Sequence, residues 1–449
     1  MARELLKRTK TTAFHAATAV ANRRPALIAL LIVGVALLAF TTWATGNVHG
    51  FRPWFFEEKY DNAFEDLLAR NRQIRILQDT GNIYEPFGSE AFTYPPGAIF
   101  IFYWTTWLPT EHVPYAWTAL TLFSMVAVFA IVLRASSRAR GLALWTLACW
   151  LTMATVAVYP PFIEVLEWGQ LAPMLLALIA IDELLLKGPG RGIAVGIASV
   201  IKLYPLLFVV AWAFRRQWGA VATALITFAT CTAIAALAWP TSAVSFFVDL
   251  MWNGQDIAHL ASNHATVVSS QSIASMLNRP PIALDPNNQI PATIVAAIVA
   301  CLGLIGAHRL WKNKQTVSTM VVLIAVSSLC SPVAWDHYFC FAPLLWWVAA
   351  ECAPRSRLRH ASVVAGLILL IPWNFWRRGK PIDAWTTTYE FITRNAIGFA
   401  VLSVVVAAAL DAWRPRTTHV LPGEPEAALR HAEQNCSKPA KDGADHHAD

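Results

Sequence analysis

Charged residues are scarce in this chain of 449 residues. Asp, Glu, Lys and Arg together make up 14% of it, whereas a soluble globular domain carries roughly 25%. Hydrophobic residues account for 56% of the chain and are gathered in long blocks. This scarcity of charge excludes an ordinary soluble domain and predicts an integral membrane protein.

Two further absences narrow the class of protein. The seven cysteines are scattered, and six of them lie in or beside apolar blocks, so no disulfide framework is predicted. Strands in which polar and apolar residues alternate are missing as well, which argues against a transmembrane barrel. The membrane-spanning segments are therefore expected to be helices.

The apolar blocks number about ten, and each is near the roughly 20 residues that a helix needs to cross a bilayer. The first, Ala26 to Thr45, is too long for a signal-peptide core and lacks a clear cleavage site, so we interpret it as a retained helix. The expected fold class is all-α, a polytopic membrane protein with about 10–12 transmembrane or re-entrant segments. The remaining blocks cover residues 115–134, 141–159, 170–187, 218–239, 291–308, 316–330, 338–352, 359–373 and 397–412.

Basic residues orient these blocks in the membrane. Six Lys and Arg residues precede the first block, so residues 1–24 are expected to be a cytoplasmic N-terminus. The segment from Gly190 to Trp212 is interrupted by Lys202 and Pro205 and has basic residues at both ends, which predicts a re-entrant hairpin of two half-helices. If this hairpin and the short segment from Thr93 to Leu108 do not cross, ten crossings keep every basic loop inside. Twelve crossings would place two basic turns outside, so ten is favoured.

This orientation divides the chain into a membrane domain, residues 25–413, and a polar tail, residues 414–449, that is expected to be disordered and cytoplasmic. The membrane domain then carries two long extracytoplasmic loops, residues 46–92 and 241–290. Two shorter polar stretches, PPFIEVLEWGQ at 160–170 and SPVAWDHY at 331–338, are expected on the same outer face. We therefore expect an extracytoplasmic site built from these four stretches.

Asp66 is the strongest candidate for a catalytic group. Most acidic residues of such a loop are simply solvated, but FEDLLARNRQIRILQ has the pattern of an amphipathic helix with Leu67, Ile74 and Leu77 on one side. Asp66 then lies in the first turn, where the helix dipole favours a carboxylate. A fixed carboxylate that faces a membrane-embedded pocket is suited to act as a general base.

Lys202 and Gln170 are candidates for binding. A lysine inside an apolar hairpin is costly unless it meets an anion, and a phosphate is a natural partner. A structural ion pair with a neighbouring helix is an equally good alternative from the sequence alone. In WGQLAPMLL, Gly169 lets a ligand approach, and the neutral amide of Gln170 suits sugar hydroxyls.

Aromatic residues and a histidine complete the candidate site. His337 lies beside Trp335, Asp336 and Tyr338 on the outer face, where contact with substrate is more plausible than a purely structural role. Tyr94 precedes a rigid Pro-Pro pair that fixes how the chain re-enters the membrane, whereas Trp104 is interpreted as an interfacial aromatic. No HxxxH, DxD or Cys/His spacing supports a metal site, and no cofactor is expected.

In their order along the chain, these residues resemble the polyprenyl-phosphate-sugar-dependent glycosyltransferases of the C-type membrane fold. The closest branch is glycosyltransferase family 87, whose members include mannosyltransferases of phosphatidylinositol mannosides and lipomannan and related arabinofuranosyltransferases. The matching residues are Asp66-Leu67, Gly81-Asn82-Ile83-Tyr84, Phe92 to Pro96, Gly169-Gln170, Lys202-Leu203-Tyr204-Pro205, Ser270-Gln271-Ser272 and Ser331 to His337.

The resemblance implies an inverting transfer of one sugar, with mannose favoured and arabinofuranose second. The sugar would pass from a polyprenyl monophosphate to a lipid-linked glycan on the extracytoplasmic face. Asp66 would be the general base, and Lys202 and His337 would stabilise the departing lipid phosphate. Substrate contacts are implied for Tyr84, Tyr94, Gln170, Gln271 and Trp335. The partners are then the donor, the acceptor and membrane lipids, without nucleic acid.

Four positions depart from the family pattern. The second His of the family is Tyr338 here, and the Tyr that commonly follows the loop Asp by four residues is Arg70. Ser270 replaces Asn, and Ala334 replaces Ser. A transporter or lipid flippase is the main rival class, since transporters also use broken helices around polar sites. No inverted repeat is detectable and the polar groups gather on one face, which argues against a transporter. A non-catalytic scaffold would not need Asp66, Lys202 and His337 together.

Overall fold

The structure is a computed structural model that describes residues 24–46, 64–84, 92–136, 139–250, 270–279, 281–284, 289–371 and 388–413. The chain separates into two units, Met1–Ala412 and Trp413–Asp449, and the helices below belong to the first. The predicted cytoplasmic segment before residue 24, the predicted tail 414–449 and parts of both long loops lie outside the described residues.

The described part of the chain is helical, apart from one isolated β-bridge between Ser270 and Trp335. The helices in the N-terminal part of the chain are α2 (Arg24–Gly46), α3 (Glu65–Thr80), α4 (Ile99–Tyr103), α5 (Val113–Ser136), α6 (Gly141–Val158), α7 (Pro160–Trp168), α8 (Ala172–Ala180), α9 (Ile193–Ile201), α10 (Leu206–Phe214), α11 (Trp218–Ala238) and α12 (Pro240–Val244). The C-terminal helices are α15 (Ile273–Leu277), α16 (Ile290–Lys312), α17 (Thr316–Leu329), α18 (Leu345–Glu351), α19 (Arg357–Ile368), α21 (Thr388–Arg394) and α22 (Ala396–Ala412). The predicted all-α fold class is confirmed.

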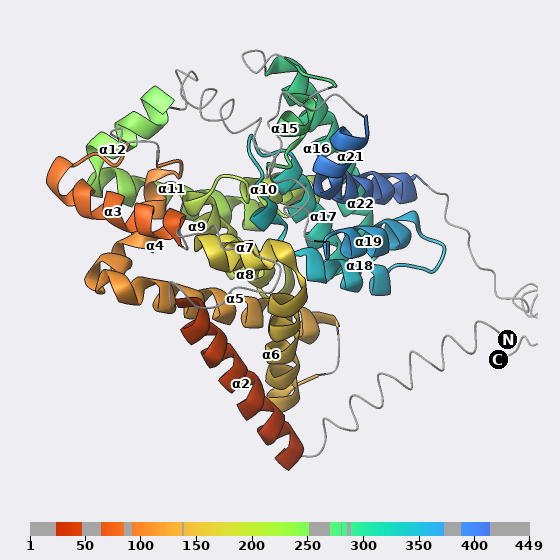
Figure 1. Cartoon of the computed structure of the whole chain (residues 1–449). Coiled ribbons are helices and arrows are strands. Elements are labelled where there is room, and N and C mark those ends of the chain that lie inside the picture. Colours follow the sequence, from red (N-terminus) through yellow and green to blue (C-terminus); the bar gives the residue numbers. More distant parts are fainter. Residues whose placement is uncertain are drawn as a thin grey trace, which may run out of the picture. The chain divides into compact units, whose positions relative to one another are not determined.

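Four described helices are long and apolar enough to cross a membrane, at Thr110–Ser136, Gly141–Val158, Trp218–Ala238 and Ile290–Lys312. A fifth crossing results if Pro160–Trp168 and Ala172–Leu185, which are bent by 114°, form one broken span. Shorter apolar helices cover Leu27–Thr41, Gly188–Ile201, Thr316–Leu329 and Ala396–Ala412. The chain is thus a multi-pass membrane protein, and the ten crossings stay a prediction. In Figure 1, α2 lies beside α6, and α16, α17, α19 and α22 pack together.

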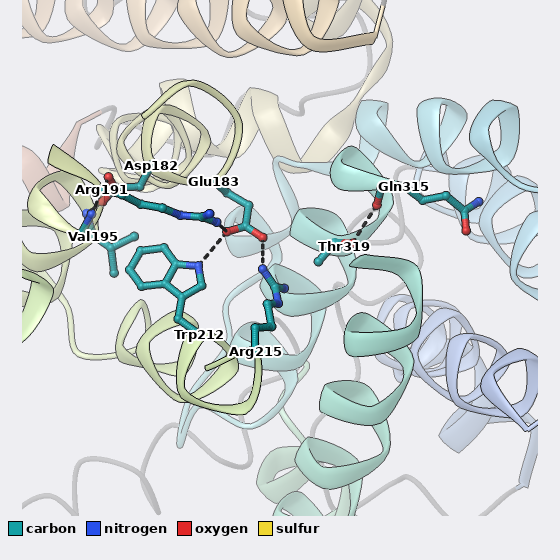
Figure 2. Close-up of polar contacts among 9 residues, drawn as sticks. Asp182, Glu183, Arg191, Val195, Trp212, Arg215, Gln315 and Thr319 are labelled. Atoms are coloured by element: carbon teal, nitrogen blue, oxygen red, sulfur yellow. Dashed lines mark hydrogen bonds and ion pairs between the residues drawn. The ribbon is translucent and has the colours of Figure 1, made fainter. Parts of the chain in front are cut away.

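The segment around Lys202 is a hairpin, as predicted. Its two halves are α9 and α10, which are broken at Lys202 to Pro205. Residues at both ends of the hairpin meet the same carboxylate, Glu183, as Figure 2 shows. Arg191 Nη2 lies 2.7 Å from Glu183 Oε2 before α9, whereas Arg215 Nη1 pairs with Glu183 Oε1 after α10. Because one side chain holds both ends, the chain must turn back at Lys202.

The carboxylate cluster at the base of this hairpin has no counterpart in the sequence analysis. Glu183 also accepts a hydrogen bond from Trp212 Nε1 at 2.8 Å (Figure 2). Asp182 accepts from the backbone N–H groups of Gly192 and Val195 at 2.8 and 2.6 Å, which caps the start of α9. Paired charges and satisfied helix ends allow these acidic groups to be buried within an apolar fold. The cluster therefore has a structural role.

Candidate active site

The loop helix α3 begins against the turn between α7 and α8. The backbone N–H of Phe64 donates to the carbonyl of Glu167 at 2.6 Å. Gly169 in that turn has a φ of 67°, which glycine adopts without strain. A Cβ there would lie 2.6 Å from Leu67 Cβ, so only glycine lets the first turn of α3 approach so closely. The contact places Asp66 beside Gln170.

Asp66 is held by a side-chain hydrogen bond. Gln170 Nε2 donates to Asp66 Oδ2, and the Gln170 side chain is itself buried. Burial raises the pKa of the Asp66 carboxyl above its ordinary value, while the positive charges of Arg70 and Lys202 oppose that rise. The predicted first-turn position on α3 is confirmed. A half-buried carboxylate with one fixed contact and an elevated pKa has the properties of a general base.

A second close approach brings the Tyr94 segment to the hairpin. A Cβ at Gly97 would lie 1.8 Å from Val200 Cγ1, two residues before Lys202. Tyr94 is buried, and its ring centre lies 5.6 Å from that of Phe102 in a tilted arrangement. Tyr84 donates its hydroxyl hydrogen to the carbonyl oxygen of Tyr94 at 2.6 Å. Tyr84 thus supports the Tyr94 segment, whereas a substrate contact of its own stays a prediction.

Lys202 is enclosed by aromatic side chains at the tip of the hairpin. Its Nζ donates to Tyr338 Oη at 2.8 Å and lies 4.1 Å from the centre of that ring. The Tyr94 ring centre lies 5.1 Å away on another side. Among the described residues no carboxylate lies within ion-pair distance of Lys202. The described residues therefore do not contain the structural ion pair that the sequence left open.

His337 follows α17 in the short 3-10 turn η7 (Asp336–Phe339). Its side chain is buried, and its Nε2 has no hydrogen-bond partner within the part of the chain that is described. Burial and the neighbouring Lys202 charge lower the pKa of His337 well below its usual range. His337 is therefore neutral at physiological pH, and it can offer a ligand one neutral N–H or one lone pair.

Gln271 and Trp335 lie where the segment that begins at Ser270 meets the SPVAWDH turn. Ser270 pairs with Trp335 in the isolated bridge, and the backbone N–H of Gln271 donates to the carbonyl of Ala334 at 2.6 Å. The Gln271 amide is occupied on both sides, since it donates to a backbone carbonyl before α22 at 2.9 Å and accepts from a backbone N–H within that helix at 3.0 Å. The backbone contact of Gln271 thus helps to position the SPVAWDH turn, and its predicted substrate contact stays a prediction.

The structure brings most of the predicted residues into one group. Asp66, Gln170, Tyr94 and Lys202 are linked by direct contacts or electrostatic interactions, and His337 adjoins Lys202. Two members were missed, Arg70 and Tyr338, although both had been noted as departures from the family pattern. The described residues hold no group of three His, Cys, Asp or Glu side chains suited to a metal ion.

Comparison with known proteins identifies the group to which this site belongs. Residues 92–332 match the family model described as glycosyltransferase family 87, which is more than half of the chain. The chain belongs to glycosyltransferase family 87. This membership confirms the predicted enzyme class, a glycosyltransferase. Asp66 precedes the matched stretch and His337 follows it, so the family match does not cover them.

Family 87 relatives of this glycosyltransferase occur in mycobacteria. A polyprenol-phosphate-mannose-dependent alpha-(1-2)-phosphatidylinositol mannoside mannosyltransferase of Mycobacterium tuberculosis is 28% identical over 65% of this chain and 68% of its own length. A polyprenol-phosphate-mannose-dependent alpha-(1-2)-phosphatidylinositol pentamannoside mannosyltransferase of Mycolicibacterium smegmatis is 24% identical over 70% of this chain and 77% of its own length. No solved structure matches the chain.

Proposed function

We propose that this family 87 glycosyltransferase transfers mannose from a polyprenyl monophosphate to a hydroxyl of a lipid-linked glycan. The observation that carries the proposal is that one acidic and one basic side chain lie in the same site. Asp66, fixed by Gln170, is a carboxylate whose burial raises its pKa, and Lys202 is a cation without a carboxylate partner among the described residues. The first group suits a proton to be removed, and the second suits a phosphate to be released.

The reaction is a single displacement at the anomeric carbon. Asp66 takes the proton of the acceptor hydroxyl while that oxygen forms a bond to the anomeric carbon. The bond between the anomeric carbon and the phosphate oxygen breaks, and the electron pair leaves with the polyprenyl phosphate. Attack and departure on opposite faces of the sugar invert the anomeric configuration. One carboxylate is sufficient for this course, because the leaving phosphate needs no proton.

The leaving phosphate is expected near Lys202 and His337. The Lys202 ammonium balances the charge that develops on the phosphate, and the buried His337 Nε2 gains the hydrogen bond that it lacks. Tyr94 adjoins Lys202 and Gln170 adjoins Asp66, so a sugar ring would be bound near these two side chains. The prenyl chain would extend between apolar helices of the membrane domain.

The donor sugar and the side of the membrane follow from two separate arguments. The mycobacterial relatives are named for mannose transfer from polyprenol-phosphate mannose, which favours mannose over arabinofuranose. The basic loops favour an extracytoplasmic site, since the site residues lie at the opposite end of the hairpin from Arg191 and Arg215. Membership in a glycosyltransferase family favours the enzyme over the rival transporter.

The experiment is a transfer assay with the purified full chain in liposomes. Polyprenyl-phosphate mannose labelled in the sugar is supplied with a phosphatidylinositol mannoside acceptor, and labelled glycolipid is measured. We expect product with mannose and much less with polyprenyl-phosphate arabinose, and we expect inverted configuration at the new bond. Transport of the labelled lipid across the bilayer without any glycolipid product would contradict the proposal.

A further inference from the structure

Tyr338 stands at the centre of the contacts that surround Lys202. Its hydroxyl oxygen accepts the Lys202 Nζ hydrogen bond at 2.8 Å, and its ring centre lies 4.1 Å from the same ammonium. Its ring centre is 5.2 Å from that of His337 and 6.1 Å from that of Tyr204. Tyr338 is half-buried. No role is yet assigned to it.

The hydrogen bond between Lys202 and Tyr338 uses the phenol oxygen as the acceptor. Lys202 Nζ is the donor. A phenol has an ordinary pKa of about 10, so Tyr338 keeps its own hydrogen and must direct it elsewhere. Within the described residues that hydrogen has no acceptor, and the adjacent buried His337 Nε2 has no partner either. The Tyr338 hydroxyl hydrogen and His337 Nε2, on adjacent side chains, thus each have no hydrogen-bond partner among the described residues.

We propose that Tyr338 binds the phosphate of the polyprenyl donor by donating its phenolic hydrogen to a phosphate oxygen, while Lys202 fixes the position of that phenol. This inference rests on the proposed function. When the bond to the anomeric carbon breaks, negative charge grows on the phosphate, and a donor already polarised by an ammonium becomes a stronger donor. The proton stays on Tyr338, and the polyprenyl phosphate leaves as an anion.

Substitutions at position 338 can test the contribution of the hydroxyl. Histidine keeps a donor, because an imidazole N–H can also donate a hydrogen bond to an anion. Phenylalanine would keep the ring beside Lys202 and lose only the hydroxyl. Comparing Tyr, His and Phe at position 338 therefore distinguishes the effect of the ring contact on binding from the effect of the hydrogen bond.

The experiment compares a polyprenyl monophosphate with the polyprenol of equal length, measured as equilibrium binding to the purified full chain. In the wild type we expect the phosphate to bind more tightly than the alcohol. In Tyr338→Phe, binding of the phosphate is expected to weaken about 10- to 100-fold, the usual loss of a hydrogen bond to a charged group, with binding of the alcohol unchanged. Tyr338→His should keep most of the preference for phosphate.

Tyr204→Phe is the matched control, because it removes a hydroxyl from the neighbouring ring, whose oxygen makes no described hydrogen bond. It should bind both ligands like the wild type. If Tyr338→Phe retains the wild-type preference, or if Tyr204→Phe loses as much, the role of Tyr338 is refuted. If Tyr338→Phe does not fold, Tyr338→Met must show the same selective loss. A wild type without any preference for phosphate would instead refute the proposed function.

Discussion

Asp66→Asn is the substitution whose effect follows most fully from the structure. The two side chains have the same shape, and the amide of the variant retains an oxygen that can accept the hydrogen bond of Gln170. The backbone contact between Phe64 and Glu167 that positions α3 is untouched. The change removes the base alone, so the fold and the docking of α3 should survive.

The expected loss is that of one positioned base, about 10²–10⁴ in rate. This corresponds to roughly 2.7–5.5 kcal/mol in the activation free energy. The assay is single-turnover transfer of mannose from polyprenyl-phosphate mannose, so that slow product release does not hide the chemical step. Binding of the donor should change little, because Asp66 is proposed to act on the acceptor hydroxyl.

Asp79→Asn supplies the matched control. Asp79 is an exposed residue in the last turn of the same helix, and its replacement should leave the rate within about twofold of the wild type. The reasoning would be refuted if Asp66→Asn kept more than a tenth of the rate while remaining folded. It would also be refuted if Asp79→Asn lost as much activity.

Three further changes test how the site is held. Arg70→Gln removes a positive charge that keeps the pKa of Asp66 from rising further. Because Asp66 acts as a base only when ionised, the acidic limb of kcat/KM against pH should move to higher pH. An unchanged profile would show that Arg70 does not act on Asp66. Gly169→Ala places a Cβ 2.6 Å from Leu67 Cβ in α3 and should lower kcat about 10²-fold, because the Asp66 carboxylate is displaced. Gly81→Ala is the control, since its φ of 75° is similar and nothing lies within 4 Å, so it should lower only the stability. Equal activity losses in both variants would refute the steric clash at Gly169. Glu183→Gln leaves Arg215 buried without its counter-charge and should lower the unfolding free energy by about 3–5 kcal/mol. Thermal unfolding in detergent measures the loss. The double variant with Arg215→Met should recover most of it.

The apolar blocks and the polar residues that interrupt them could be predicted from the sequence, because each depends only on residues close together along the chain. Most predicted blocks are occupied by helix within the described residues, but the block 338–352 divides into two short 3-10 turns and α18. The hairpin was evident from a lysine and a proline inside an apolar stretch with basic residues at both ends. Asp66 was selected by its place in the first turn of an amphipathic helix, and α3 has that place and that buried face.

The contacts between distant segments were not readable in the same way. The pairing of Lys202 with Tyr338 joins residues 136 positions apart, and no pattern within either segment announces it. Glu183 resembles any acidic residue at the end of a span until the fold brings Arg191 and Arg215 to it. The two backbone groups that the Gln271 amide contacts, before and within α22, are likewise more than a hundred residues away along the chain.

The central claim is that Lys202 binds the phosphate of the donor. The most direct measurement is the equilibrium binding of polyprenyl monophosphate to Lys202→Met, which preserves the length and apolar character of the side chain. The account predicts binding weaker by about 1.5–3 kcal/mol, roughly 10- to 100-fold in Kd, with acceptor affinity unchanged. Wild-type affinity for the phosphate in a folded Lys202→Met protein would contradict it.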